Sequence, residues 1–164
     1  MQEAQELSKI GSWQFYLKER KFSSSKELLR IFELEGVEEE SLRPAFFERI
    51  HKDDIQIVDK LMTDFHAGGE YYVFEHRAVI PNKGIKYILC KAKPLFDNQN
   101  ELIGFKGVSQ DITEKKLQEK TIEQNMEMLN NKNEELKLLI ESNLQLENFA
   151  YIASHDLKSP VRTI

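Results

Sequence analysis

The sequence predicts an α+β protein, in which a five-stranded antiparallel sheet with short helices over one face is followed by one long helix. Two observations lead to this fold class. The first is a change of composition near residues 111–113, because all seven glycines and three of the four prolines come before it. The second is the order of patterns before that point: two strands, several short helices, then three strands joined by tight turns.

The N-terminal part contains the first two strands and a capped helix. Residues 1–9 are compatible with a helical N-terminal cap, and residues 12–17 alternate as a strand does. A polar turn over residues 18–21 leads to the second strand. Ser24 and Glu27 then have capping-box spacing, with Ser24 placed to accept a helix amide, so we expect a short helix to begin there.

Two more helices are expected before the remaining strands. One begins near Ser41, since Pro44 then falls in the first turn, where a missing N–H costs little. The next begins at Asp53 or Asp54 and runs through Ala67, where two glycines end it.

The last three strands form a meander. Residues 71–80, 85–96 and 102–112 are rich in aromatic and branched side chains. Turn-forming residues separate them at 81–84 and 97–100. Tight turns join neighbouring antiparallel strands, so these three strands are expected to lie side by side.

Composition and charge exclude several classes of protein. The net charge of -5 argues against nucleic acid as a main partner, because a phosphate-binding face needs clustered Lys and Arg. The single cysteine, Cys90, excludes an internal disulfide framework. No apolar run is long enough to span a membrane, and the N-terminus lacks a secretion signal. We therefore expect a cytoplasmic protein without membrane contact in this chain.

Residues 10–113 resemble a PAS domain. The resemblance is carried by Trp13 and by residues 24–32, 50–54, 74–77, 82–84 and 104–113. It implies a five-stranded sheet with a hollow helical cover that senses a small molecule, light, redox state or nothing at all. In the family motif at residues 51–54, Lys52 stands where a proline is usual, and we expect little consequence. The closing segment, with Asp111 and Thr113, is the most distinctive part and is expected to couple the sensor to the C-terminal helix.

A heptad can be written through the rest of the chain. One seam position holds Ile122, Leu129, Leu136, Asn143, Ala150 and Leu157, and the other holds Asn125, Lys132, Leu139, Leu146 and Ala153. The later heptads are cleaner than the earlier ones. The pattern predicts a parallel homodimer, with residues 114–146 as a signalling coiled-coil helix that continues into residues 147–164. The polar seam positions indicate either poor packing or a register kept near balance.

A histidine with an acidic neighbour stands near the C-terminus. His155 and Asp156 are followed by Pro160, which lacks the N–H that would bond the Asp156 carbonyl, so the helix should bend there. Residues 149–162 are similar to the phosphoacceptor box of sensor histidine kinases. That resemblance implies that residues 147–164 are the start of a dimerisation and histidine phosphotransfer helix. It also implies that His155 accepts a phosphoryl group, that Asp156 is its acid/base partner, and that Pro160 forms the bend.

The resemblance also implies partners. The parent protein would use ATP and Mg through an ATP-binding domain, and would pass the phosphoryl group to a response regulator receiver domain. Residues 1–164 lack that ATP-binding domain and should be inactive alone. Two alternatives remain: a non-catalytic PAS ligand-binding and dimerisation module, or an adaptor to another output domain such as a nucleotide cyclase.

Other polar residues carry weaker expectations. His51 with Asp53 and Asp54 is explained better by carboxylates at a helix start than by a metal site. His66 and His76 lack partners at metal-ligand spacing, and residues 75–77 fit the solvated face of a strand. Cys90 stands outside the cysteine motif of photoactive flavin PAS domains. No metal is expected, no cofactor is expected in this chain, and the PAS ligand is unknown.

Overall fold

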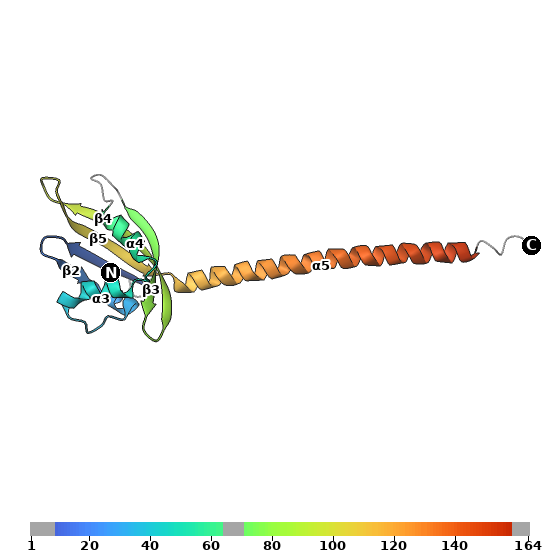
Figure 1. Ribbon diagram of the computed structural model, residues 1–164, viewed down its shortest axis with the longest axis horizontal. Helices are drawn as coiled ribbons and strands as arrows, with labels where there is room; N and C mark the ends of the chain where they lie inside the picture. The colour runs from blue at the N-terminus through green and yellow to red at the C-terminus, as the bar shows by residue number, and fades with distance from the viewer. Residues whose placement is uncertain (1–8, 64–70, 159–164) are drawn as a thin grey trace, which may run out of the picture. The chain divides into compact units, whose positions relative to one another are not determined.

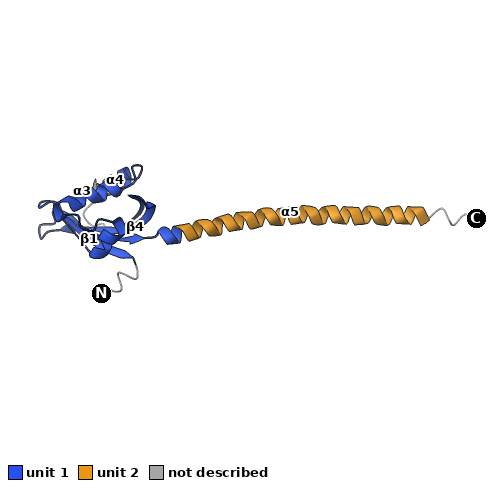
Figure 2. Ribbon diagram, turned by 90° about the horizontal axis from the view of Figure 1, so that it is seen from below, with its two compact units in different colours: residues 1–116 blue, residues 117–164 orange. Residues whose placement is uncertain are grey.

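The computed structural model describes residues 9–63 and 71–158. The chain divides into two compact units, residues 1–116 and residues 117–164, which are coloured separately in Figure 2. The predicted N-terminal helical cap (residues 1–9), His66 and Pro160 lie wholly or almost wholly outside the described residues.

Unit 1 is built on one antiparallel sheet of five strands, in the order β2-β1-β5-β4-β3 (Figure 1). The strands are β1 (Ile10–Tyr16), β2 (Lys21–Ser24), β3 (Tyr72–Ile80), β4 (Gly84–Phe96) and β5 (Leu102–Asp111). The first and last strands in sequence are neighbours, with Ile10 opposite Gln110. The predicted five-stranded antiparallel sheet is confirmed, and the three late strands begin and end within one residue of their predicted limits.

Turn chemistry fixes the order of the late strands. The turn from β3 to β4 contains Asn82 with φ 62° and ends at Gly84 with φ 90°, in the region that favours asparagine and glycine. The turn from β4 to β5 is closed by Asp97, whose carboxylate accepts the amides of Gln99 and Glu101 at 2.8 and 2.9 Å. Both turns are those indicated by the sequence.

Three helices belong to unit 1: α2 (Lys26–Phe32), α3 (Glu39–Arg49) and α4 (Ile55–Thr63). The predicted cap of the first was wrong by one residue. Ser25 is the N-cap, and its hydroxyl accepts the amide of Leu28 at 3.3 Å and that of Ser12 at 3.0 Å. Ser24 instead ends β2, where it pairs with Trp13, so its backbone belongs to the sheet.

The second helix also starts earlier than predicted. α3 begins at Glu39 rather than Ser41, so Pro44 lies inside the helix and not in its first turn. Two acidic residues, Glu39 and Glu40, occupy that first turn, where negative charge favours a helix start. α4 was predicted to continue to Ala67, which lies outside the described residues.

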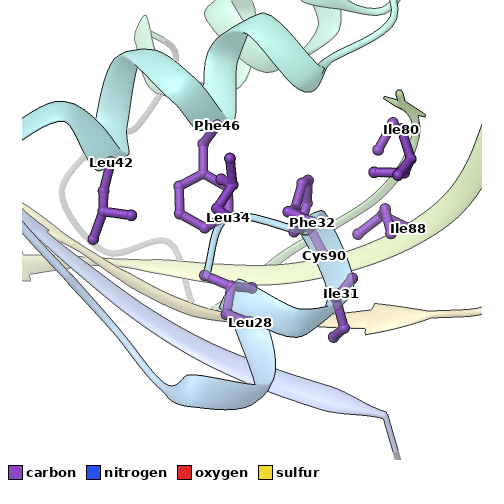
Figure 3. Close-up of a cluster of buried hydrophobic side chains, with 10 residues drawn as sticks. Leu28, Ile31, Phe32, Leu34, Leu42, Phe46, Ile80, Ile88 and Cys90 are labelled. Atoms are coloured by element: carbon purple, nitrogen blue, oxygen red, sulfur yellow. The ribbon is translucent and has the colours of Figure 1, made fainter. Parts of the chain in front are cut away.

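The core lies between the helices and the facing side of the sheet. Figure 3 shows Leu42 and Phe46 of α3 opposite Leu28, Ile31 and Phe32 of α2. Strand residues complete the cluster: Ala78 and Ile80 from β3, and Ile88 and Cys90 from β4. The Phe32 and Phe46 rings meet edge to face with centroids 4.8 Å apart. This apolar contact holds the helices over the sheet.

Two strand glycines permit close approach. A Cβ on Gly11 would collide with the backbone of Leu28, and a Cβ on Gly104 would collide with the carbonyl oxygen of Phe15. Glycine at these positions lets α2 lie against β1 and lets β5 pair tightly with β1.

A single helix, α5 (Thr113–Lys158), follows β5 without interruption for 46 residues. The predicted long C-terminal helix is therefore confirmed. None of its described residues is buried. Its large apolar side chains include Leu129, Leu136, Leu139, Leu146 and Leu157, each exposed by more than half.

Candidate functional site

The junction between β5 and α5 is held by a compact hydrogen-bond network. Asp111 Oδ1 accepts the Thr113 amide at 3.0 Å and the Thr113 hydroxyl at 2.6 Å. The same hydroxyl oxygen accepts the Tyr87 amide of β4 at 3.0 Å. In return, the Ile112 amide donates to the Tyr87 carbonyl at 2.9 Å. The first residue of α5 is thereby fixed to two strands.

A lysine extends this network to the helical cover. Lys86 Nζ lies 3.4 Å from Asp111 Oδ2 and donates to the Ile31 carbonyl of α2 at 2.7 Å. Two ion pairs add to the first helical turn, Lys116–Glu75 at 2.7 Å and Lys9–Glu114 at 3.1 Å. The second of these pairs is solvent-exposed and contributes little to stability. The directional hydrogen bonds of Asp111 and Thr113 therefore dominate the junction.

His155 and Asp156 lie in the last described turn of α5. Their side chains are 74% and 76% exposed, and His155 Nδ1 is 3.7 Å from Asp156 Oδ1. That distance is longer than a hydrogen bond, as expected for adjacent helical residues, which do not face each other. Nδ1 is the ring nitrogen near the carboxylate, and the His155 side chain as a whole is largely exposed. Pro160 lies beyond the described residues.

A small cavity lies between the helical cover and the sheet. Its volume is about 90 Å³. It is lined by Trp13, Phe22, Leu28, Phe32, Phe46, Phe47, Ile50, Val58, Phe74, His76, Cys90, Ala92 and Ser109. None of these described lining residues is an acid, a lysine or an arginine. Most of the wall is aromatic or aliphatic, and the polar atoms gather on the sheet.

Those polar atoms form a chain across four neighbouring strands. Trp13 Nε1 of β1 donates to Ser109 Oγ of β5 at 3.1 Å. Ser109 Oγ lies 3.0 Å from Cys90 Sγ of β4, and Cys90 Sγ lies 3.7 Å from His76 Nε2 of β3. His76 Nδ1 is 3.3 Å from the Arg77 carbonyl oxygen. Since Cys90 and Ser109 are also direct cross-strand partners, the chain follows the sheet register.

The protonation states of His76 and Cys90 fix which group donates in each hydrogen bond of this row. A carbonyl oxygen only accepts, so His76 Nδ1 carries the proton and Nε2 is an acceptor. Burial lowers the pKa of His76, which keeps the ring neutral. Burial also raises the pKa of the Cys90 thiol to about 11, so the sulfur keeps its proton. The thiol then donates to His76, the Ser109 hydroxyl to the thiol, and the Trp13 indole to Ser109.

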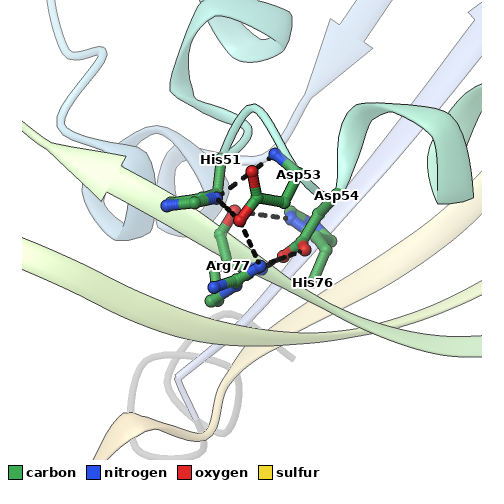
Figure 4. A network of polar contacts seen from close by, with 5 residues as sticks. All are labelled: His51, Asp53, Asp54, His76 and Arg77. Carbon is green, nitrogen blue, oxygen red and sulfur yellow. Dashed lines mark hydrogen bonds and ion pairs between the residues drawn. The ribbon is translucent and has the colours of Figure 1, made fainter.

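Asp54, which is buried, and Arg77, which is half-buried, form a second polar group, drawn in Figure 4. Arg77 donates to the Asp54 carboxylate through its amide, Nε and Nη2 at 2.7, 2.9 and 2.6 Å. Asp53 is also near, 3.5 Å from Nη2, but its side chain is 60% exposed. These hydrogen bonds hold the pKa of Asp54 at about 2. The pair ties the start of α4 to the edge strand β3.

One expectation about these residues was wrong and another was incomplete. Asp54 does stand at the start of α4, where its carbonyl accepts the amides of Ile57 and Val58, but its carboxylate also binds Arg77, which the sequence did not indicate. Residues 75–77 were expected to form a solvated strand face, but His76 is only 6% exposed and lines the cavity. Strand alternation explains the buried position, since His76 shares its face with Ala78 and Ile80. The strand register that places it near Cys90 could not be derived from one sequence.

Neither a metal site nor a membrane-spanning helix is found in the described part of the chain. In residues 9–63 and 71–158, no group of three His, Cys, Asp or Glu side chains is arranged to hold a metal ion. The helices of those same residues include none with the length and apolar character needed to cross a bilayer.

Comparison with known proteins identifies the fold. No protein-family model and no curated protein matched the chain. A solved structure of a sensory box histidine kinase/response regulator from Burkholderia thailandensis is similar, with a TM-score of 0.58 and 21% identity over 79% of this chain and 97% of that one. The N-terminal domain of a diguanylate cyclase with PAS/PAC sensor from Marinobacter aquaeolei is also similar, with a TM-score of 0.55 and 15% identity over 65% and 97%. The chain has the PAS fold followed by a long helix.

Proposed function

We propose that this chain is the sensory and dimerising part of a two-component sensor histidine kinase, in which unit 1 acts through α5 on phosphoacceptor His155. One observation carries the proposal. An unbroken helix begins in the Asp111–Thr113 junction and bears exposed His155 and Asp156 in its last described turn. Kinase neighbours of the same fold are consistent with this role, although a cyclase shares the fold too.

The junction supports the sensory part of the proposal. Thr113 depends on Asp111 of β5 and on Tyr87 of β4, so a small shift between these strands changes the position of the first helical residue. Lys86 adds a link from the same aspartate to α2, which lies in the helical cover. A change in the core of unit 1 therefore has a short, hydrogen-bonded route to α5.

The exposed apolar residues of α5 support dimerisation. An isolated helix is marginal in water, because most helix stability comes from burying an apolar face. The seam residues Leu129, Leu136, Leu139 and Leu146 are 54–63% exposed in the single chain. A parallel partner would bury them as knobs in holes. Such a homodimer gives the helix the burial that it lacks alone.

Polar seam residues would make that dimer adjustable. Asn125 and Lys132 occupy seam positions in the first heptads, where they weaken packing. Asn143 at a seam position favours two strands and a defined register. A dimer with a weak first half and a firm second half can respond to unit 1 near Thr113 while holding the helices together near His155.

The chemistry at His155 would be a phosphoryl transfer. Nε2 attacks the γ-phosphorus of ATP, the bond from phosphorus to the ADP oxygen breaks, and ADP leaves with that electron pair. Asp156 stabilises the positive charge on the ring and accepts a hydrogen bond from Nδ1 after a side-chain rotation. The bend expected at Pro160 would loosen the backbone beside this pair.

The remaining parts would come from partners. An ATP-binding domain of the parent protein would hold ATP and Mg, and a response regulator receiver domain would take the phosphoryl group onto an aspartate. These assignments rest on the resemblance of residues 149–162 to the phosphoacceptor box.

Labelled ATP tests the proposal directly. The chain is mixed with the parent ATP-binding domain, Mg and ATP labelled at the γ-phosphate. We expect acid-labile, base-stable label on His155, and none in His155→Gln. His51→Gln is the matched control, because His51 lies in unit 1 near Asp53, and it should label as the unaltered chain does.

Two outcomes would contradict the kinase assignment. Label on another residue would remove His155 from its role. No label, with an ATP-binding domain that is active on another substrate, would favour a binding module or an adaptor to another output.

A further inference from the structure

The size of the cavity in unit 1 limits which molecules it can hold. Its volume of about 90 Å³ is below the roughly 300–1,000 Å³ typical of sites for drug-sized ligands. It is also below the roughly 150 Å³ of an engineered apolar cavity that binds benzene. An occupant must therefore be a molecule of a few heavy atoms, far smaller than a flavin or a haem.

The lining also limits the charge of an occupant. Apolar side chains such as Phe32, Phe46 and Phe74 form most of the wall, and no described lining residue carries a formal charge opposite to an ion. The neutral state of His76 follows from its burial. Transfer of an ion into such surroundings without a partner is strongly unfavourable. A neutral molecule with an apolar body fits.

The polar chain selects a hydrogen-bond donor. His76 Nε2 is an acceptor, and its partner is the Cys90 thiol at 3.7 Å. A thiol is a weak donor, so this link is the weakest of the chain from Trp13 to His76. The other links end on Ser109 and on the Arg77 carbonyl at 3.0–3.3 Å. A hydroxyl or N–H group on a ligand would bind Nε2 better than the thiol does.

We infer that the cavity binds a small uncharged organic molecule with one hydroxyl or N–H donor, which bonds His76 Nε2 while its apolar part lies against the aromatic wall. This inference rests on the proposed sensory function and names the ligand class of that sensor. The ligand's donor replaces the Cys90 thiol as the partner of His76 Nε2. The thiol then forms a hydrogen bond with Ser109 alone. Ser109 is two residues from Asp111 on β5, so the change begins beside the junction.

Trp13 provides the measurement. It is the only tryptophan of the chain, and its indole N–H ends the polar chain at Ser109. The full chain is titrated with n-butanol, with its isomer diethyl ether, which lacks a donor, and with butyrate, which is charged. Trp13 fluorescence and the single indole N–H resonance are recorded. We expect saturable binding of n-butanol, at least about fivefold tighter than diethyl ether, and no competing binding of butyrate.

Variants assign the effect to the cavity. His76→Phe should abolish the preference for the alcohol over the ether. Cys90→Ala should tighten alcohol binding about two- to fivefold, because the competing thiol is gone. Ala92→Leu should fill the cavity and prevent binding of both molecules. Val108→Leu is the matched control, because Val108 is 37% exposed on the other face of β5, and it should bind as the unaltered chain does.

Three results would overturn the inference: equal binding of alcohol and ether, binding of butyrate in competition with n-butanol, or no saturable change, which means that the cavity holds only water. Cys90→Ala keeps the test decisive if Ala92→Leu does not fold. The labelling of His155 does not require an occupied cavity, and ligand binding does not require His155. Failure of one therefore leaves the other standing.

Discussion

Replacing Asp54 by asparagine should make the free energy of unfolding of unit 1 depend less on pH below neutrality. Asparagine keeps the shape of the side chain and resembles a protonated aspartate, but it lacks the negative charge that Arg77 binds through three nitrogens. The pKa of Asp54 falls from 3.8 in the unfolded chain to about 2 in the fold. Because the folded pKa is the lower one, the charge stabilises the fold above pH 4 and ceases to do so as the pH falls towards 2.

The size of the effect follows from that difference. Each unit by which a pKa differs between the folded and unfolded states corresponds to about 1.4 kcal/mol. The ionised Asp54 therefore contributes about 2 kcal/mol at pH 7, about half as much at pH 3, and nothing well below pH 2. The Asp54→Asn variant should be less stable than the unaltered chain by those amounts.

Urea unfolding followed by Trp13 fluorescence measures the difference. Trp13 lies in β1 of unit 1, so its signal reports the sheet and not the long helix. Protein concentration is held constant, since self-association would add to apparent stability. Asp53→Asn is the matched control: Asp53 also approaches Arg77 but is 60% exposed, and its loss should cost less than about 1 kcal/mol. A difference for Asp54→Asn that stays constant from pH 7 to pH 3 would refute this reasoning, as would an equal loss in the control.

Three further predictions concern the junction, the helix and the sheet. Thr113→Val should destabilise unit 1 by about 1–3 kcal/mol, because the Tyr87 amide loses its acceptor, while Thr113→Ser should not; equal losses in urea unfolding would contradict this. Leu139→Asn should weaken self-association at least about 100-fold in analytical ultracentrifugation. Leu138→Asn, similarly exposed in one chain but outside the seam, should have little effect, and a comparable loss would argue against the heptad register. Gly104→Ala should lower stability by about 2 kcal/mol or more, because its Cβ meets a β1 carbonyl, and a normal melting temperature would exclude that close contact.

Much of the fold could be predicted because the signals are local. Turns at Asn82 and Asp97 and the alternation of side chains between them place the three late strands. The absence of glycine after residue 113 and the heptad pattern predict the long helix. The errors at Ser24 and Pro44 are shifts of one or two residues at helix starts, where sheet pairing and first-turn charge decide the boundary.

The polar sites depend on contacts that are distant in sequence. Asp54 and Arg77 are 23 residues apart, and Trp13 and Ser109 are 96 apart. Each residue alone had an ordinary explanation, such as a helix start or a solvated strand. Only the strand order β1-β5-β4-β3 brings Trp13, Ser109, Cys90 and His76 into one row. His155 is different, because its prediction came from a local motif and still awaits the labelling test.

Because α5 is continuous, supercoiling in the proposed dimer would change the direction in which His155 points relative to Thr113. Thr113 and His155 are 42 residues apart, which is six heptads, so both occupy the heptad position farthest from the seam. In a straight helix the face drifts by about 20° per heptad, so these two residues would point in directions that differ by about 120°. A left-handed supercoil removes that drift. Pairing of two helices in the proposed dimer would therefore turn His155 by about a third of a revolution relative to Thr113, and insertions or deletions in α5 should be tolerated mainly in multiples of seven residues.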